Sequence, residues 1–256
     1  MKLVILVLLL TFSNAYGLQE EYLDLVKKCL TNSIYKDPVI RDEMERPSLE
    51  EMVNADLTHV QVMSSYPCLT SLELLMKDVV DNGIEGDFIE TGVWKGGTCI
   101  FMRAFLKSIG DTHRTVWVAD SFKGLPPPSL KEDKGLDLHL IPWLAISLDE
   151  VKANFKRYGL LDHQVKFLRG WFKDTLHKAP IKKLAILRLD GDLYESTMDS
   201  LNALYDKVSI GGYVIIDDYG AINACAQAVE DFRNKRGITD TIYGVNWTVA
   251  YWQKTQ

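Results

Sequence analysis

The hydrophobic positions of this chain follow two patterns that alternate along its length. Short apolar runs bounded by turn-forming or charged residues are typical of buried strands, whereas apolar residues recurring every three to four positions are typical of helices. Strands are predicted at 87–90, 115–119, 165–169, 184–189, 212–216, 238–243 and 247–252. Helices are predicted at 18–36, 69–82, 99–107, 148–158, 194–207 and 221–235. This alternation predicts an α/β fold, with a mostly parallel sheet of seven strands and helices on both faces.

The N-terminus departs from this pattern. Lys2 precedes an apolar run over 3–12, and the small residues after this run have the spacing that signal peptidase prefers at its cleavage site. Residues 1–17 are therefore predicted to be a secretory signal or a short membrane anchor. The alternatives are a buried N-terminal helix or an upstream extension of a cytosolic enzyme. Residues 18–83 are expected to form an N-terminal helical region, with a flap of one or two short helices over 38–66. The α/β domain then spans 84–256.

Composition narrows the class of protein. A chain of 256 residues with 47% apolar and 25% charged residues can form one globular domain with appendages. The net charge of −6, without a Lys/Arg-rich block, argues against a nucleic-acid partner. Four cysteines without CxxC spacing indicate core thiols rather than a zinc site or a disulfide framework.

Two predicted strands end on aspartates. Asp190 follows the strand at 184–189, and Asp217 with Asp218 follows the strand at 212–216. In an open α/β sheet these ends lie at the ligand-binding edge, where clustered carboxylates favour a hard cation such as Mg²⁺. The alternative is helix capping, by Asp192 or Asp218, of the helices that begin just after them.

A glycine-rich turn after the first core strand indicates a cofactor. The residues from Glu90 to Gly96 follow the pattern acid-x-Gly-x-x-x-Gly, and the glycines let the backbone approach a ligand closely. An acid at this strand end opposes a pyrophosphate but suits the cationic S-adenosylmethionine. Asp120, at the end of the second core strand, is placed to hold two ribose hydroxyls.

Several motifs together resemble the TylF/MycF macrocin O-methyltransferases over roughly 19–256. They are Glu90–Phe101 (ETGVWKGGTCIF), Thr115–Phe122 (TVWVADSF), Ser147–Leu161 (SLDEVKANFKRYGLL), Gly170–Leu176 (GWFKDTL), Arg188–Asp192 (RLDGD) and Gly211–Tyr219 (GGYVIIDDY). The resemblance implies a Rossmann-like class I methyltransferase fold and an O-methyltransferase that uses S-adenosylmethionine and Mg²⁺. It assigns the metal to Asp190, Asp217 and Asp218. It assigns the cofactor to Glu90, Thr91, Gly92, Asp120, Ser121, Gly170 and Trp171.

Methyl transfer to oxygen also requires a group that accepts the hydroxyl proton. Asp190 is the first candidate and His139, in the long segment 121–147, is the second. The expected partner is a small-molecule hydroxyl acceptor of the sugar or natural-product type, and a homo-oligomer is left open. Two alternatives are an NAD(P)-dependent oxidoreductase and a secreted, non-catalytic binding protein that kept the fold.

Overall fold

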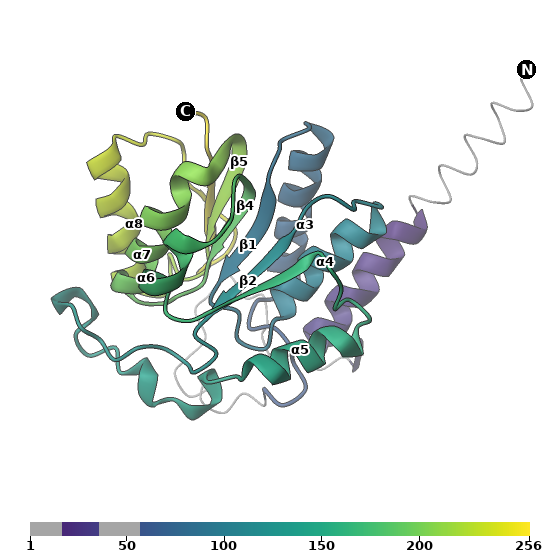
Figure 1. Cartoon of the computed structure of the whole chain (residues 1–256), viewed down its shortest axis with the longest axis horizontal. Helices are drawn as coiled ribbons and strands as arrows, with labels where there is room; N and C mark the ends of the chain where they lie inside the picture. The colour runs from purple at the N-terminus through teal and green to yellow at the C-terminus, as the bar shows by residue number, and fades with distance from the viewer. Residues whose placement is uncertain (1–16, 36–56) are drawn as a thin grey trace, which may run out of the picture.

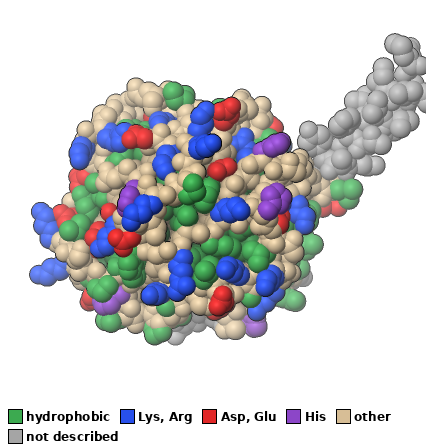
Figure 2. Space-filling view, in the orientation of Figure 1, with side chains coloured by type: hydrophobic (Ala, Val, Ile, Leu, Met, Phe, Trp, Pro, Cys, Tyr) green, Lys and Arg blue, Asp and Glu red, His purple; other side chains and the backbone are tan. Residues whose placement is uncertain are grey.

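The computed structural model describes residues 17–35 and 57–256 (Figure 1). The predicted signal segment, apart from residue 17, lies outside the described residues, and so does most of the predicted flap. Within the described ranges, no helix has the length and apolar character needed to cross a membrane. On the face drawn in Figure 2, basic and acidic side chains are dispersed among apolar ones.

The core is one sheet with strand order β3-β2-β1-β4-β5-β7-β6. Strands β1 to β5 pair in parallel, and β7 runs antiparallel to β5 and β6, so the predicted mostly parallel seven-stranded sheet is confirmed. The chain order reverses between β1 and β4, and ligands of open α/β sheets bind at such a switch point. The strands are β1 (Asp87–Thr91), β2 (Val116–Asp120), β3 (Val165–Arg169), β4 (Leu184–Leu189), β5 (Val208–Ile216), β6 (Tyr243–Gly244) and β7 (Ala250–Gln253).

Helices cover both faces of this sheet, as Figure 1 shows. Alternate residues of a strand point to opposite faces, so Phe88 packs in the cluster formed with α3, α4 and α5, whereas Ile89 packs with α7 and α8. The helix over 17–30 joins the first cluster through Leu23, Val26 and Leu30. The other helices are α3 (Tyr66–Asp81), α4 (Gly97–Ser108), α5 (Leu148–Arg157), α6 (Phe172–Thr175), α7 (Tyr194–Leu204) and α8 (Asn223–Arg236).

The prediction of a strand over 238–243 is largely wrong, because β6 contains only two residues. In the segment before β6, Asp240 forms hydrogen bonds with side chains instead of with a neighbouring strand. Arg233 donates to its backbone carbonyl, and the Thr255 hydroxyl donates to its carboxylate. Residues 57–65, the described end of the predicted flap, contain no helix. Within the long segment 121–147 the structure forms only three short 3-10 turns, η2 (Lys131–Asp133), η3 (Leu138–Leu140) and η4 (Pro142–Leu144).

Candidate active site

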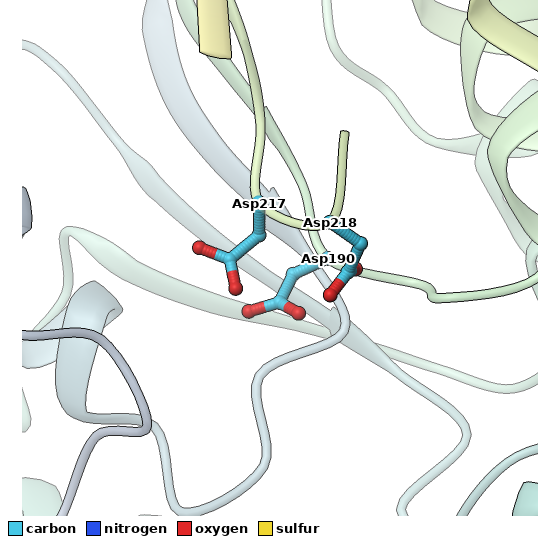
Figure 3. A group of neighbouring side chains, drawn as sticks. All are labelled: Asp190, Asp217 and Asp218. Carbon is cyan, nitrogen blue, oxygen red and sulfur yellow. The ribbon is translucent and has the colours of Figure 1, made fainter. Parts of the chain in front are cut away.

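Three aspartates meet at the carboxyl ends of β4 and β5. Asp190 follows β4, and Asp217 and Asp218 follow β5. The three residues lie close together because β4 and β5 are paired in parallel and end at the same edge of the sheet. Figure 3 shows the three carboxylates turned toward one another. One oxygen from each lies within 4.8 Å of the others, an all-oxygen donor set of the kind that Mg²⁺ prefers. The residues therefore fit a hard divalent cation.

The capping alternative is wrong for α7. Its first N–H groups, from Tyr194 and Glu195, donate to the carboxylate of Asp133 at 2.6 and 3.1 Å, and Asp192 does not cap it. Before α8 the backbone carbonyl of Asp218, not its side chain, accepts two N–H groups. The Asp218 carboxylate instead accepts the N–H of Asp192 at 3.3 Å. These aspartates are thus not used as side-chain caps.

Arg188, within β4, is the cation that the sequence analysis missed. Its side chain is 4% exposed and lies among Glu90, Asp190 and Asp217. The distance from Arg188 Nη1 to the Asp190 carboxylate is 2.6 Å, and Nη2 donates to the Ser64 hydroxyl at 2.9 Å. An arginine inside an otherwise apolar strand was the available signal, since a charge is buried only when it is paired.

One guanidinium does not balance the negative charge of this site. Burial, and then the charge of Asp217, raises the pKa of Asp190 well above its usual range, although Arg188 opposes the rise. Burial and the charges of Asp192 and Asp190 raise the pKa of Asp218 in the same way. Burial, with a contribution from Asp217, raises the pKa of Asp192 to about 7. A divalent cation among these carboxylates would favour their charged forms.

A cavity of about 390 Å³ adjoins the cluster and lies over the ends of β1, β2 and β4. Five of the seven predicted cofactor residues line it, together with Asp190. These five are Gly92, Asp120, Ser121, Gly170 and Trp171. The proline run Pro126–Pro128 forms part of the wall, which the sequence analysis did not assign to the site. The cavity therefore joins the predicted cofactor positions to one member of the acidic cluster.

The turn after β1 is shaped by close backbone approach. Gly92 has φ +89°, and a Cβ there would lie 1.6 Å from the carbonyl oxygen of Asp190, so no other residue fits. Asp120 ties this turn to β2, because its carboxylate accepts the N–H of Val93 at 2.8 Å and that of Phe122 at 2.6 Å. Burial raises the pKa of Asp120, and these backbone hydrogen bonds oppose the rise.

Glu90 and Thr91 differ from the other predicted cofactor residues, since both are only 1% exposed and neither lines the cavity. The Glu90 carboxylate pairs with Arg188 and accepts a hydrogen bond from the Cys99 thiol at 3.0 Å. The cation beside Glu90 in the structure is an arginine of the neighbouring strand, and the prediction that Glu90 contacts the cofactor stays a prediction. The backbone carbonyl of Thr91 accepts the N–H of Asp190 at 2.9 Å, which joins β1 to the start of the cluster.

His139 is not brought to the cavity. It is half-buried in η3, it does not line the cavity, and its Nδ1 has no hydrogen-bond partner among the described residues. Of the two predicted proton acceptors, only Asp190 lies where a hydroxyl could meet both the acidic cluster and the cavity. All four cysteines are free thiols.

The segment 57–64 forms a further part of the site, which the sequence analysis placed only within a flap. The Lys95 ammonium, in the glycine turn, donates to the backbone carbonyls of Leu57 and Val60 at 2.6 and 3.1 Å. This anchoring places Met63 in the cavity wall and Ser64 beside Arg188. The turn and the acidic cluster are thereby linked by one stretch of chain.

Comparison with known proteins gives a family and several relatives. The family model of macrocin-O-methyltransferase (TylF) matches residues 56–254. A Streptomyces olivaceus protein, 8-demethyl-8-(2,3-dimethoxy-alpha-L-rhamnosyl)-tetracenomycin-C 4'-O-methyltransferase, is 49% identical over 242 residues, or 91% of this chain and 92% of the relative. The mycinamicin III 3''-O-methyltransferase of Micromonospora griseorubida is 42% identical over 247 residues, or 92% and 97% of the two chains.

Solved structures agree with this grouping. The O-methyltransferase NovP superimposes with a TM-score of 0.84 at 44% identity, covering 93% of this chain and all of its own. The calicheamicin methyltransferase CalS11 superimposes with a TM-score of 0.61 at 18% identity, covering 89% and 91% of the two chains, which is a likeness of fold. The predicted class I methyltransferase fold, with its N-terminal helical extension, is confirmed.

Proposed function

Because the chain belongs to the macrocin O-methyltransferase (TylF) family, we propose that it methylates a sugar hydroxyl of a glycosylated natural product and that magnesium assists the transfer. The chain is an O-methyltransferase of the class I fold, with S-adenosylmethionine as methyl donor. This membership replaces the oxidoreductase and non-catalytic alternatives.

The acceptor class is carried over from relatives at 42–49% identity. Their names specify a rhamnosyl tetracenomycin, demethyldecarbamoylnovobiocin and mycinamicin III, which are natural products of different skeletons. We therefore assign this chain a sugar or related natural-product hydroxyl, without choosing a skeleton.

The observation that carries the proposal is the double position of Asp190, which belongs both to the acidic cluster and to the cavity wall. An acceptor hydroxyl held at the cluster would therefore face the cavity in which the predicted cofactor residues lie. Asp190, Asp217 and Asp218 would hold the magnesium ion. A bound ion would lower the pKa of the acceptor hydroxyl and fix its direction.

The residues of the chain then have separate tasks. Asp120 would accept hydrogen bonds from the ribose hydroxyls of the cofactor, Gly92 would let the backbone approach its methionine part, and Trp171 would pack beside its adenine. When bound, S-adenosylmethionine would supply the methyl group to the hydroxyl oxygen and would leave as S-adenosylhomocysteine, with the electron pair of the broken carbon–sulfur bond on sulfur. Asp190, which belongs both to the acidic cluster and to the cavity wall, would accept the hydroxyl proton.

The test is transfer of an isotopically labelled methyl group from S-adenosylmethionine to a panel of glycosides that carry free sugar hydroxyls. We expect the label in a sugar methoxy group, loss of transfer after chelation, and recovery on adding Mg²⁺. Calorimetry should show that S-adenosylmethionine still binds after chelation. Full transfer in the presence of chelator would contradict the metal assignment, and label found only on aglycone hydroxyls would contradict the acceptor class.

A further inference from the structure

The acidic site contains a cation of its own, the guanidinium of Arg188. We propose that Arg188 is a permanent counter-ion of this site, which holds the carboxylates in place before a divalent cation binds and limits how tightly that cation is then held. This inference rests on the proposed magnesium site and concerns how that site is tuned.

The contacts of Arg188 come from four separate parts of the chain. Within the buried pocket Nη1 donates to Glu90 of β1 and to Asp190 after β4, and Nη2 donates to Asp217 after β5 and to Ser64. An arginine side chain provides five N–H donors in a rigid fork and does not lose its proton in proteins. The positive charge is therefore a fixed property of the site, and chelation does not remove it.

The same contacts leave room for a second cation. Arg188 engages Oδ2 of Asp190 and Oδ1 of Asp217, so the other oxygen of each carboxylate is not used by the guanidinium. Asp218 completes the trio without a hydrogen bond from Arg188 among those of the described residues. A guanidinium and a divalent cation would thus share two carboxylates.

Sharing has an electrostatic consequence. Two cations separated by the width of a carboxylate repel each other, and in a buried site this repulsion is weakly screened. Arg188 should therefore lower the affinity for magnesium while it stabilises the metal-free protein. A purely structural tie between β1, β4 and β5 would affect stability but would not change the affinity for the cation.

The experiment compares wild type with Arg188→Met and Arg188→Lys, and it uses Arg103→Met as the matched control. Arg103 is also buried, at 5% exposed, and pairs with a carboxylate, Asp162 at 2.6 Å, but it lines neither the cavity nor the cluster. Thermal unfolding with and without Mg²⁺, and calorimetric titration with Mg²⁺, are measured for each protein.

We expect both methionine variants to unfold at a lower temperature than wild type without metal, because each leaves a carboxylate without its partner. Only Arg188→Met should bind Mg²⁺ more tightly than wild type does, by about tenfold or more. Its unfolding temperature should therefore rise more on adding Mg²⁺ than that of wild type. Arg188→Lys retains the charge, so its Mg²⁺ affinity should stay close to that of wild type. Arg103→Met should respond to Mg²⁺ as wild type does.

Three outcomes would overturn the inference, each in a different way. If Mg²⁺ stabilises wild type and Arg188→Met binds it no more tightly, the guanidinium is only a structural tie. If Mg²⁺ affects neither protein, the proposed magnesium site is wrong and this inference falls with it. If Arg188→Met does not fold without metal, recovery of cooperative unfolding on adding Mg²⁺ supports the counter-ion role, and failure to recover contradicts it.

Discussion

Replacing Asp120 by asparagine should separate the cofactor role of this residue from its role in the fold. Its two carboxylate oxygens accept the N–H groups of Val93 and Phe122, so an amide would place its own NH₂ against one of these donors. An unsatisfied donor of this kind costs about 1–3 kcal/mol of stability. Loss of a charge-assisted hydrogen bond to the ribose should lower the affinity for S-adenosylmethionine by about ten- to hundredfold.

Asp87 offers a matched control at the opposite end of the sheet. Its two oxygens accept the N–H of Thr115 at 2.9 Å and the indole N–H of Trp117 at 2.8 Å, so Asp87→Asn creates the same conflict between donors away from the cavity. Urea unfolding should show a similar loss of stability in both variants. Calorimetry with S-adenosylmethionine should show weaker binding only for Asp120→Asn. Equal affinities in the two variants would refute the ribose assignment.

The same residue gives a prediction for pH. Burial raises the pKa of Asp120, so on acidification the folded protein binds a proton at this site at a higher pH than the unfolded chain does. Its contribution to stability therefore increases as pH falls and is lost as pH rises through the raised pKa. Cofactor binding needs the charged form, so affinity should fall on acidification in wild type, and this contribution should be absent in Asp120→Asn.

Two further changes probe the surroundings of the site. Gly92→Ala should abolish cofactor binding and lower the urea midpoint of unfolding far more than Gly110→Ala does. A Cβ at Gly92 would lie 1.6 Å from a carbonyl oxygen, whereas a Cβ at Gly110, which is also at positive φ, would have nothing within 4 Å. Similar losses of stability in the two variants would contradict the close approach at Gly92. Asp133→Ala should cost about 0.5–2 kcal/mol in urea unfolding, because it removes the cap of α7, and unchanged stability would show that this cap is not needed.

Local pattern was enough for the parallel strands β1 to β5 and for the position of the acidic trio, but not for β6. Strand ends of a parallel sheet share one edge, so Asp190 and Asp217 could be placed together before any coordinates were known. The pairing of Glu90 with Arg188 was missed because Glu90 was assigned to a cationic cofactor, and because the contact depends on the order of the strands, which places β4 beside β1. The cap of α7 comes from Asp133, 61 positions before Tyr194, which no local pattern reveals.

The most direct test of the account is the behaviour of Asp217→Asn in methyl transfer. Asparagine can still accept a hydrogen bond from Arg188 but brings no charge to the cluster, and the cofactor cavity is lined by other residues. We predict that the variant binds S-adenosylmethionine as wild type does yet transfers no methyl group at any Mg²⁺ concentration that supports wild type. A fully active Asp217→Asn enzyme that is insensitive to chelator would contradict the central claim.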